Sequence, residues 1–99
     1  MSTEIDFALD LDIKIKYPKK YKVYILNDNY TSMDFVVDIL TSVFNKTSRE
    51  AEAIMLEVHE KDIGLCGVYT HEVAETKVLT VAKKAKDSAF PLKAIMEEE

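Results

Sequence analysis

A run of three polar residues, Asn27, Asp28 and Asn29, directly follows a short apolar segment. Their side-chain oxygens are hydrogen-bond acceptors, and Asp28 adds a negative charge. Acceptors gathered on one rim could hold a cationic ligand group, and nearby apolar residues could form a floor beside them: Ile25, Met33 and Val36. The same three polar residues are also typical of a turn that ends a strand and leads into a capped helix. The local sequence leaves both interpretations open.

His59 is the second residue that could contribute to such a site. It stands at the end of a predicted helix, one turn after Met55, where histidine is also common as a surface or capping residue. Asp28, Glu57 and His59 could in principle perform acid–base chemistry, and the chain would then be a small hydrolase around Asp28 and His59. No phosphate-binding loop or further catalytic group supports that interpretation.

Two other patterns resemble catalytic motifs but are incomplete. His71 and Glu72 begin like the helix of a zinc protease, yet the fourth residue after His71 is Glu75, so the second histidine ligand is missing. Cys66 lies in the middle of a predicted strand, where a buried and unreactive cysteine is the usual case. We therefore predict that the chain is not an enzyme and needs no metal or other cofactor.

The composition limits the class of protein further. The 99 residues are 47% hydrophobic, which is sufficient for one modest core in a single domain. The net charge is −5, with 18 acidic and 13 basic residues, so the chain lacks the basic character that nucleic-acid binding requires. A single cysteine excludes an internal disulfide. Without a basic leader or a long apolar run, the sequence predicts a soluble cytoplasmic protein with no membrane partner.

Strands and helices must position the candidate residues. The spacing of apolar residues indicates where these elements lie. Residues 21–26 favour a strand, and Thr31 is a suitable N-cap for a helix that extends to about Asn45. Thr47 and Glu50 have the spacing of a capping box for a second helix. The remaining elements expected are a strand at residues 63–69, a helix at residues 72–87 capped by Thr70, and a β-like segment at residues 91–96.

The predicted order of elements is thus β-α-α-β-α-β. The fold class expected is α+β, with a three-stranded, mostly antiparallel sheet and helices packed on one face. The core domain would comprise residues 21–99, and residues 1–20 would form a flexible N-terminal tail. In that tail, apolar residues occupy alternate positions from Ile5 to Tyr17. The tail could therefore pair occasionally with a sheet edge, or it could add a strand to a partner.

Three blocks of the sequence resemble one protein family. They are YKVYILNDNYTSMDFVVDIL, IMLEVHEKDIGLCGVYTHEVAETKV and the closing PLKAIMEEE. In this order they are similar to the ClpS family of adaptors for Clp-type AAA+ proteases. The similarity spans roughly residues 21–99, and GVYTHEVAETKV is its most specific part. It implies a protein that binds N-degrons, which are polypeptides whose first residue is a bulky hydrophobe, typically Leu, Phe, Tyr or Trp.

The resemblance also implies roles for individual positions. Asn27 and His59 match residues that hydrogen-bond the α-amino group of the substrate, and Asp28 and Asn29 match an acidic pair beside it. Met33 matches a gate against β-branched first residues. The positions that match the lining of the side-chain pocket are Ile25, Thr31, Met33, Val36, Met55, Val58 and Leu92.

Partners are implied in the same way. Glu72 and Lys77 match positions that dock the N-terminal domain of a ClpA- or ClpC-like unfoldase, and the tail matches the extension that the unfoldase engages during delivery. The alternative is a docking modulator that diverts the unfoldase from other substrates and binds none itself. Two residues depart from the family pattern. Asn29 replaces the second acid, which predicts weaker charge complementarity, and Ser32 stands where proline is common.

Overall fold

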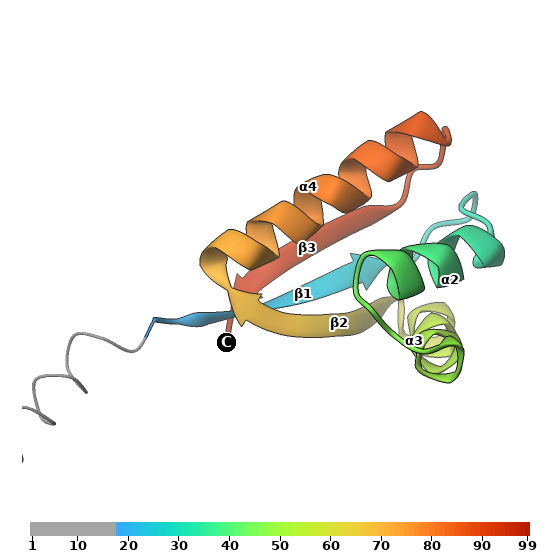
Figure 1. The fold of residues 1–99 in the computed structure, drawn as a ribbon. Coiled ribbons are helices and arrows are strands. Elements are labelled where there is room, and N and C mark those ends of the chain that lie inside the picture. Colours follow the sequence, from blue (N-terminus) through green and yellow to red (C-terminus); the bar gives the residue numbers. More distant parts are fainter. Residues whose placement is uncertain (1–17) are drawn as a thin grey trace, which may run out of the picture.

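The computed structural model describes residues 18–99 as strands and helices in the order β-α-α-β-α-β (Figure 1). The strands are β1 (Lys20–Leu26), β2 (Ile63–Thr70) and β3 (Lys93–Glu98), and the helices are α2 (Met33–Ser42), α3 (Ser48–Lys61) and α4 (His71–Asp87). The predicted α+β class and element order are confirmed. The alternating segment of the predicted tail, from Ile5 to Tyr17, lies outside the described residues.

The sheet has β1 at its centre, in the order β2-β1-β3, and both neighbours run antiparallel to it. Leu26, the last residue of β1, pairs with Ile63 of β2 and with Lys93 of β3. At the other end of β1, Lys20 pairs with Thr70, which directly precedes α4. The loop that follows β1 and the beginning of α4 therefore lie at opposite ends of the sheet.

The side chains of each strand alternate between the two faces of the sheet. The core lies on the face that the helices cover. In β1, Val23 and Ile25 are fully buried, whereas the residues next to them stay partly exposed. Helix α4 runs along the sheet and contacts all three strands, while α3 contacts β2 and α2 packs on α3 (Figure 1). The buried apolar residues are Val23, Ile25, Val36, Ile39, Leu40, Val43, Phe44, Ala51, Val58, Cys66, Ala74, Val81, Ala85 and Leu92.

Gly64 allows α3 to lie close to β2. A Cβ atom at this position would stand 2.5 Å from Val58 Cγ2, which is a steric overlap, and 3.2 Å from Ile54 Cγ2. A residue without a side chain is therefore needed where the helix and the strand approach each other. The approach matters for the site described below, because the last turns of α3 form one of its walls.

The first described helix, α2, differs from its prediction at both ends. Its N-cap is Ser32, whose Oγ accepts a hydrogen bond from a first-turn amide at 3.1 Å, and not Thr31. The Thr31 amide and hydroxyl instead both donate to the carboxylate of Asp28, in the loop before the helix. The helix ends at Ser42 and not at about Asn45, which has a left-handed backbone with φ 56°.

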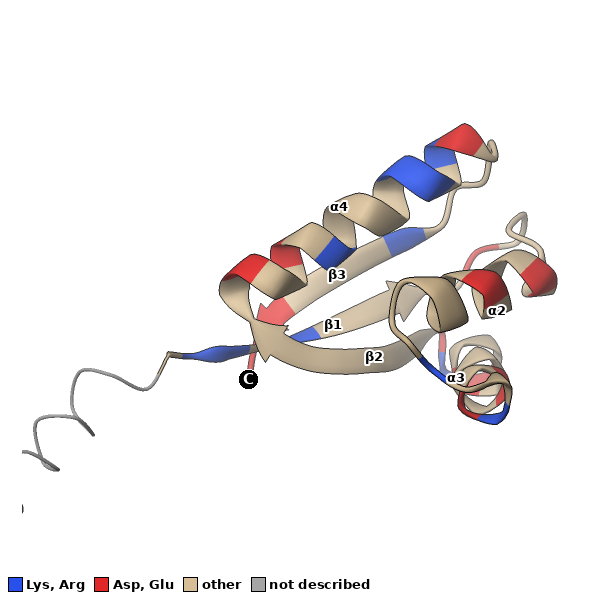
Figure 2. Ribbon diagram, viewed as in Figure 1, with Lys and Arg blue, Asp and Glu red and all other residues tan. Residues whose placement is uncertain are grey.

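The other two helices begin where their capping signals lie. The predicted capping box of α3 is confirmed: the Glu50 amide donates to Thr47 Oγ1 at 3.1 Å, and the Thr47 amide donates to Glu50 Oε1 at 2.9 Å. Thr70 occupies the N-cap position of α4, but its side chain makes no capping hydrogen bond. Acidic side chains near the start of α4 and basic ones in its last turn complement the helix dipole (Figure 2).

Within residues 18–99, no helix is long and apolar enough to cross a membrane. In the same part of the chain, no three His, Cys, Asp or Glu side chains come together as a group that could hold a metal ion. Cys66 is fully buried in the core.

The Cys66 thiol is expected to be unreactive in the folded protein. Burial raises the pKa of this thiol to about 12, and the thiolate is the form that reacts. At pH 8 the group therefore remains a protonated thiol. We expect negligible alkylation by iodoacetamide at pH 8 in native protein and complete alkylation after unfolding in guanidinium. Alkylation of the native protein at the rate of a free cysteine would contradict the prediction.

Candidate functional site

Asp28 shapes the loop between β1 and α2. Its carboxylate accepts hydrogen bonds from the Tyr30 amide at 2.8 Å, the Thr31 amide at 2.6 Å and the Thr31 hydroxyl at 2.7 Å. Bonds from the backbone two and three residues further on are typical of an aspartate that closes a tight turn. The turn interpretation of the Asn-Asp-Asn run is thus confirmed for Asp28. The turn also places its two neighbours on the rim of a pocket.

The Asp28 carboxylate is ionised at neutral pH. Partial burial would by itself raise its pKa, but hydrogen bonds from the Thr31 side chain and from the Thr31 and Tyr30 amides outweigh this effect and lower the pKa. A group whose pKa is lowered by folding contributes stability above its unfolded-state pKa, and that stability is lost as the pH falls through the folded-state value. The loop therefore keeps both its turn and its negative charge throughout the neutral range.

A pocket of about 300 Å³ opens between this loop, the start of α2 and the last turns of α3. Met33 is 62% exposed at its edge, whereas Val58 is only 4% exposed. The pocket combines polar groups from the loop with apolar groups from both helices. Its lining residues are Asn27, Asp28, Asn29, Thr31, Met33, Val36, Met55, Leu56, Val58 and His59.

The structure brings into this pocket every residue expected to hold an amino group and most of those expected to surround a side chain. Ile25 and Leu92 are the exceptions, because both are buried in the core and neither lines the pocket. Ile25 shares its strand face with Val23, and this face is covered by the helices. Leu56 lines the pocket but was not predicted. Its position three residues before His59 on the same helix face is a signal that could have identified it.

Asn27 and His59 bring acceptors to the rim from two different elements. The Asn27 amide donates to the Asp62 carbonyl oxygen at 3.0 Å, and the Asn27 side-chain nitrogen donates to Asp62 Oδ1 at 3.3 Å. The side-chain oxygen of Asn27 is left as an acceptor. His59 is exposed in the last turn of α3, and within residues 18–99 no hydrogen bond occupies its imidazole. A neutral imidazole therefore offers one acceptor nitrogen to the pocket.

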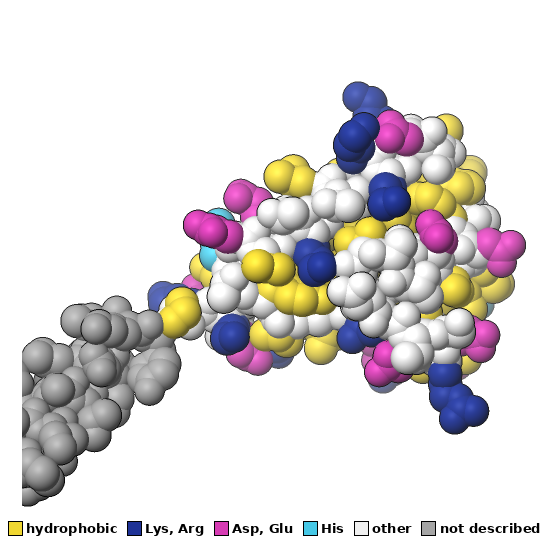
Figure 3. Space-filling model, viewed as in Figure 1, with side chains coloured by type: hydrophobic (Ala, Val, Ile, Leu, Met, Phe, Trp, Pro, Cys, Tyr) yellow, Lys and Arg dark blue, Asp and Glu magenta, His cyan; other side chains and the backbone are white. Residues whose placement is uncertain are grey.

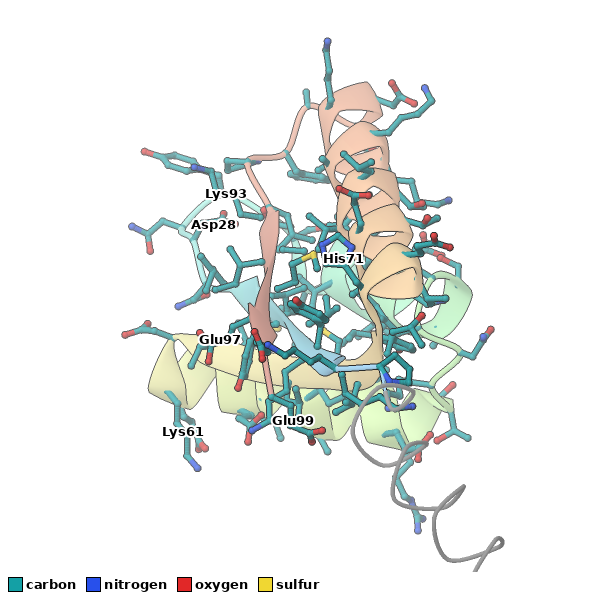
Figure 4. All side chains as sticks on the ribbon, turned by 90° about the vertical axis from the view of Figure 1, so that its left-hand side faces the viewer. Asp28, Lys61, His71, Lys93, Glu97 and Glu99 are labelled. Atoms are coloured by element: carbon teal, nitrogen blue, oxygen red, sulfur yellow. The ribbon has the colours of Figure 1, made fainter. Side chains whose placement is uncertain are left out.

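The charges around the pocket favour a cationic ligand. Between residues 27 and 42 the charged side chains are Asp28, Asp34 and Asp38, and this stretch contains no Lys or Arg (Figure 2). The C-terminal end of α3 adds the partial negative charge of its helix dipole. Lys61, in the last turn of α3, points away from the sheet (Figure 4). The pocket thus pairs an apolar interior with a polar rim that carries the negative charge of Asp28.

Helix α2 is held in place by an aromatic contact. Hydrophobic side chains reach the surface between α4 and α2 (Figure 3). The ring of Phe35, in α2, lies against the ring of Phe90, in the connection between α4 and β3, with centroids 4.9 Å apart. Because α2 carries Met33 and Val36, this contact helps to fix one wall of the pocket.

The two predicted docking residues differ in accessibility. Glu72 is exposed in the first turn of α4. Lys77 is partly buried, and its ammonium donates to the Val43 carbonyl oxygen at 2.8 Å and lies 5.4 Å from the centroid of the Tyr69 ring. Val43 is the C-cap of α2, so Lys77 ties the end of α2 to α4. A direct contact between this ammonium and a partner would compete with that hydrogen bond.

The predicted docking residue Glu72, at the start of α4, and the pocket lie toward opposite ends of the sheet. Figure 4 shows Asp28 near Lys93, the first residue of β3, whereas Glu99 lies beyond the other end of that strand. The seven residues of β1 separate the loop from the start of α4, which corresponds to about 20 Å. A ligand in the pocket would therefore leave the start of α4 uncovered.

A small α+β domain with an apolar pocket and an acceptor-lined rim has the form of a ligand-binding module. Residues 16–95 match the family described as ATP-dependent Clp protease adaptor protein ClpS. The ATP-dependent Clp protease adapter protein ClpS of Oleidesulfovibrio alaskensis is 51% identical over 98 residues, covering 99% of this chain and 94% of that protein. Its counterpart from Acetivibrio thermocellus is 48% identical over the full length of both chains.

A solved structure shares the fold. It is that of Agrobacterium tumefaciens ClpS2 bound to L-phenylalaninamide, which superimposes with a TM-score of 0.81 at 34% identity and covers 84% of this chain and 100% of that one. The chain belongs to the ClpS family of Clp protease adapters. The family resemblance inferred from the three sequence blocks is thereby confirmed.

Proposed function

We propose that this chain binds the free α-amino group and the bulky hydrophobic first residue of N-degron polypeptides and delivers them to a ClpA- or ClpC-like unfoldase. It acts in the cytoplasm and has no catalytic step of its own. The observation that carries the proposal is the pocket itself, in which Asn27 and His59 stand beside the apolar side chains of Met55 and Val58. L-phenylalaninamide, the ligand of the related ClpS2 structure, joins a free amino group to an aromatic side chain, as the first residue of a peptide does.

The polar rim suits an α-ammonium group. Such a group has a pKa of about 7.7–8.0 and is therefore largely protonated at neutral pH, when it seeks hydrogen-bond acceptors. The Asn27 side-chain oxygen and a neutral His59 imidazole each supply one acceptor, and Asp28 adds negative charge nearby. Acetylation of the amine would remove its charge and most of its donors, so a blocked peptide should not bind.

The apolar interior selects the side chain. Burying a Leu or Phe side chain contributes about 1.5–3 kcal/mol relative to leaving it exposed. Since 1.4 kcal/mol corresponds to about tenfold in affinity, Phe or Leu should be preferred over Ala by roughly 10- to 100-fold. Met33, exposed at the pocket edge, acts as the gate that disfavours a β-branched first residue, because branching at Cβ would bring a methyl group against it.

Delivery requires that substrate and unfoldase bind together. The exposed Glu72 lies at the far end of the sheet from the pocket, so the two partners need not exclude each other. We assign unfoldase docking to the surface around Glu72, with Lys77 beside it on α4.

Fluorescence titration with dye-labelled peptides that differ only in residue one tests this function. We expect tight binding for Phe and Leu, weak binding for Ala, and no binding for an Nα-acetylated Phe peptide. The matched variant Met55→Ser should weaken binding of Phe much more than binding of Ala. Equal affinity for Phe and Ala would contradict the proposal and would favour the docking modulator. Binding of the acetylated peptide would place the binding site elsewhere.

A further inference from the structure

Asp62 has a left-handed backbone conformation, which is uncommon for residues other than glycine. It is the C-cap of α3, with φ 69° and ψ −4°, in the left-handed region. Glycine is the usual residue there, because a Cβ atom is sterically unfavourable in this conformation. A residue other than glycine that is held in a disfavoured conformation beside a binding pocket suggests that its side chain has a function.

The side chain of Asp62 contacts a residue of the pocket rim. Asp62 and Asn27 make two hydrogen bonds: the Asn27 amide donates to the Asp62 carbonyl oxygen at 3.0 Å, and the Asn27 side-chain nitrogen donates to Asp62 Oδ1 at 3.3 Å. The first bond continues the ladder beyond the last β1–β2 pair, Leu26 with Ile63. A glycine could make this first bond but not the second. The second bond therefore depends on the side chain of Asp62.

The second bond has a definite consequence for the orientation of the Asn27 side chain. An ionised carboxylate only accepts hydrogen bonds, so the atom of Asn27 that faces it must be the nitrogen. The other end of the amide, the carbonyl oxygen, is then left for the pocket that Asn27 lines. Without the carboxylate, water could bond either end of the amide, and its donor nitrogen could turn toward an incoming ammonium group.

We propose that Asp62 is a positioning residue that fixes the Asn27 amide with its oxygen available to the substrate's α-ammonium. This inference rests on the proposed function. The bond from the Asn27 nitrogen to the carboxylate also polarises the amide, and this makes its oxygen a stronger acceptor. Asp62 thereby supplies negative charge near the amine site, where Asn29 stands in place of an acid. The weaker charge complementarity expected from Asn29 is offset in this way.

The test uses Asp62→Gly, which removes the carboxylate and suits the left-handed backbone. We expect this variant to fold with an unchanged or higher melting temperature and to bind the Phe peptide roughly 5- to 10-fold more weakly. Asp62→Asn, which retains an acceptor without the charge, should lie between it and the wild type. Glu60→Gln removes a charge from the same helix end outside the pocket lining and should bind like the wild type. Equal weakening by Glu60→Gln would show that the loss of a negative charge is sufficient to explain the effect, and this would overturn the proposal.

Nuclear magnetic resonance of the Asn27 side chain gives a readout that needs no peptide. In the wild type, the two amide protons of this side chain should be well separated and protected from exchange, and in Asp62→Gly they should approach the values of a free asparagine. Unchanged side-chain resonances in Asp62→Gly would overturn the positioning role even if peptide affinity fell. Failure of the wild type to bind the Phe peptide would contradict the proposed function, while the resonances would still decide the role of Asp62.

Discussion

Replacing His59 by alanine is expected to weaken binding of a Phe- or Leu-initiated peptide by about 10- to 100-fold without lowering the melting temperature. The loss reflects a hydrogen bond to a charged group, which contributes about 1.5–3 kcal/mol. The stability should be unchanged, because His59 is exposed and its imidazole makes no hydrogen bond within residues 18–99. Peptide titration and thermal unfolding, followed on the same samples, separate the two effects.

The acceptor role of His59 can be tested separately from the loss of its ring. His59→Gln retains a hydrogen-bond acceptor at this position, so it should bind the Phe peptide more tightly than His59→Ala does. Peptide titration of both variants beside the wild type measures the difference. An equal loss of affinity in the two variants would contradict the acceptor role of His59.

Replacing Lys77 by alanine is expected to destabilise the domain as well as impair docking on the unfoldase. The ammonium bonds the Val43 carbonyl oxygen at 2.8 Å and is partly buried near the Phe44 and Tyr69 rings. Loss of this bond, and of the packing of the side-chain stem, should lower the free energy of unfolding by about 1–3 kcal/mol. A domain of this size should then melt at least about 4 °C lower. Thermal unfolding and titration with the unfoldase N-terminal domain measure both effects.

Glu72→Ala is the matched control for Lys77. Glu72 lies on the same helix but is exposed, so its loss should impair docking without changing the melting temperature. Lys77→Arg should recover much of the stability, because a guanidinium can still donate to a carbonyl oxygen. If Lys77→Ala abolished docking at an unchanged melting temperature, the ammonium would contact the unfoldase directly, and its bond to α2 would be unimportant for stability.

The secondary structure was predictable because its signals are local. Alternating apolar residues in YKVYIL and apolar residues at three- and four-residue spacing in the helices depend only on neighbours in the chain. The capping box of Thr47 and Glu50 is such a signal, and it was predicted correctly. The N-cap of α2 was misplaced by one residue because Asp28 engages Thr31 and leaves Ser32 to cap the helix. Competition between two nearby polar residues is decided by loop geometry, which the residue types do not determine.

The candidate site was predictable in part, and the family resemblance supplied most of it. Local sequence alone could not join Asn27 to His59, because they are brought together by the packing of α3 against β2 and the loop. Ile25 and Leu92 are buried in the core and do not line the pocket, so their place in the site stays a prediction from the resemblance. Leu56 was missed because it lies outside the apolar face that packs on the core, although it shares a helix face with His59.

By itself, the sequence determined the order of elements and, through its most specific blocks, membership of the ClpS family. These properties depend on residue types at fixed spacing along the chain. Only the tertiary structure decided that Lys77 bonds the end of α2 and that Asp62 holds the side chain of Asn27. Each of these contacts joins residues more than thirty positions apart, and its existence depends on distances and directions between packed elements that no local pattern encodes.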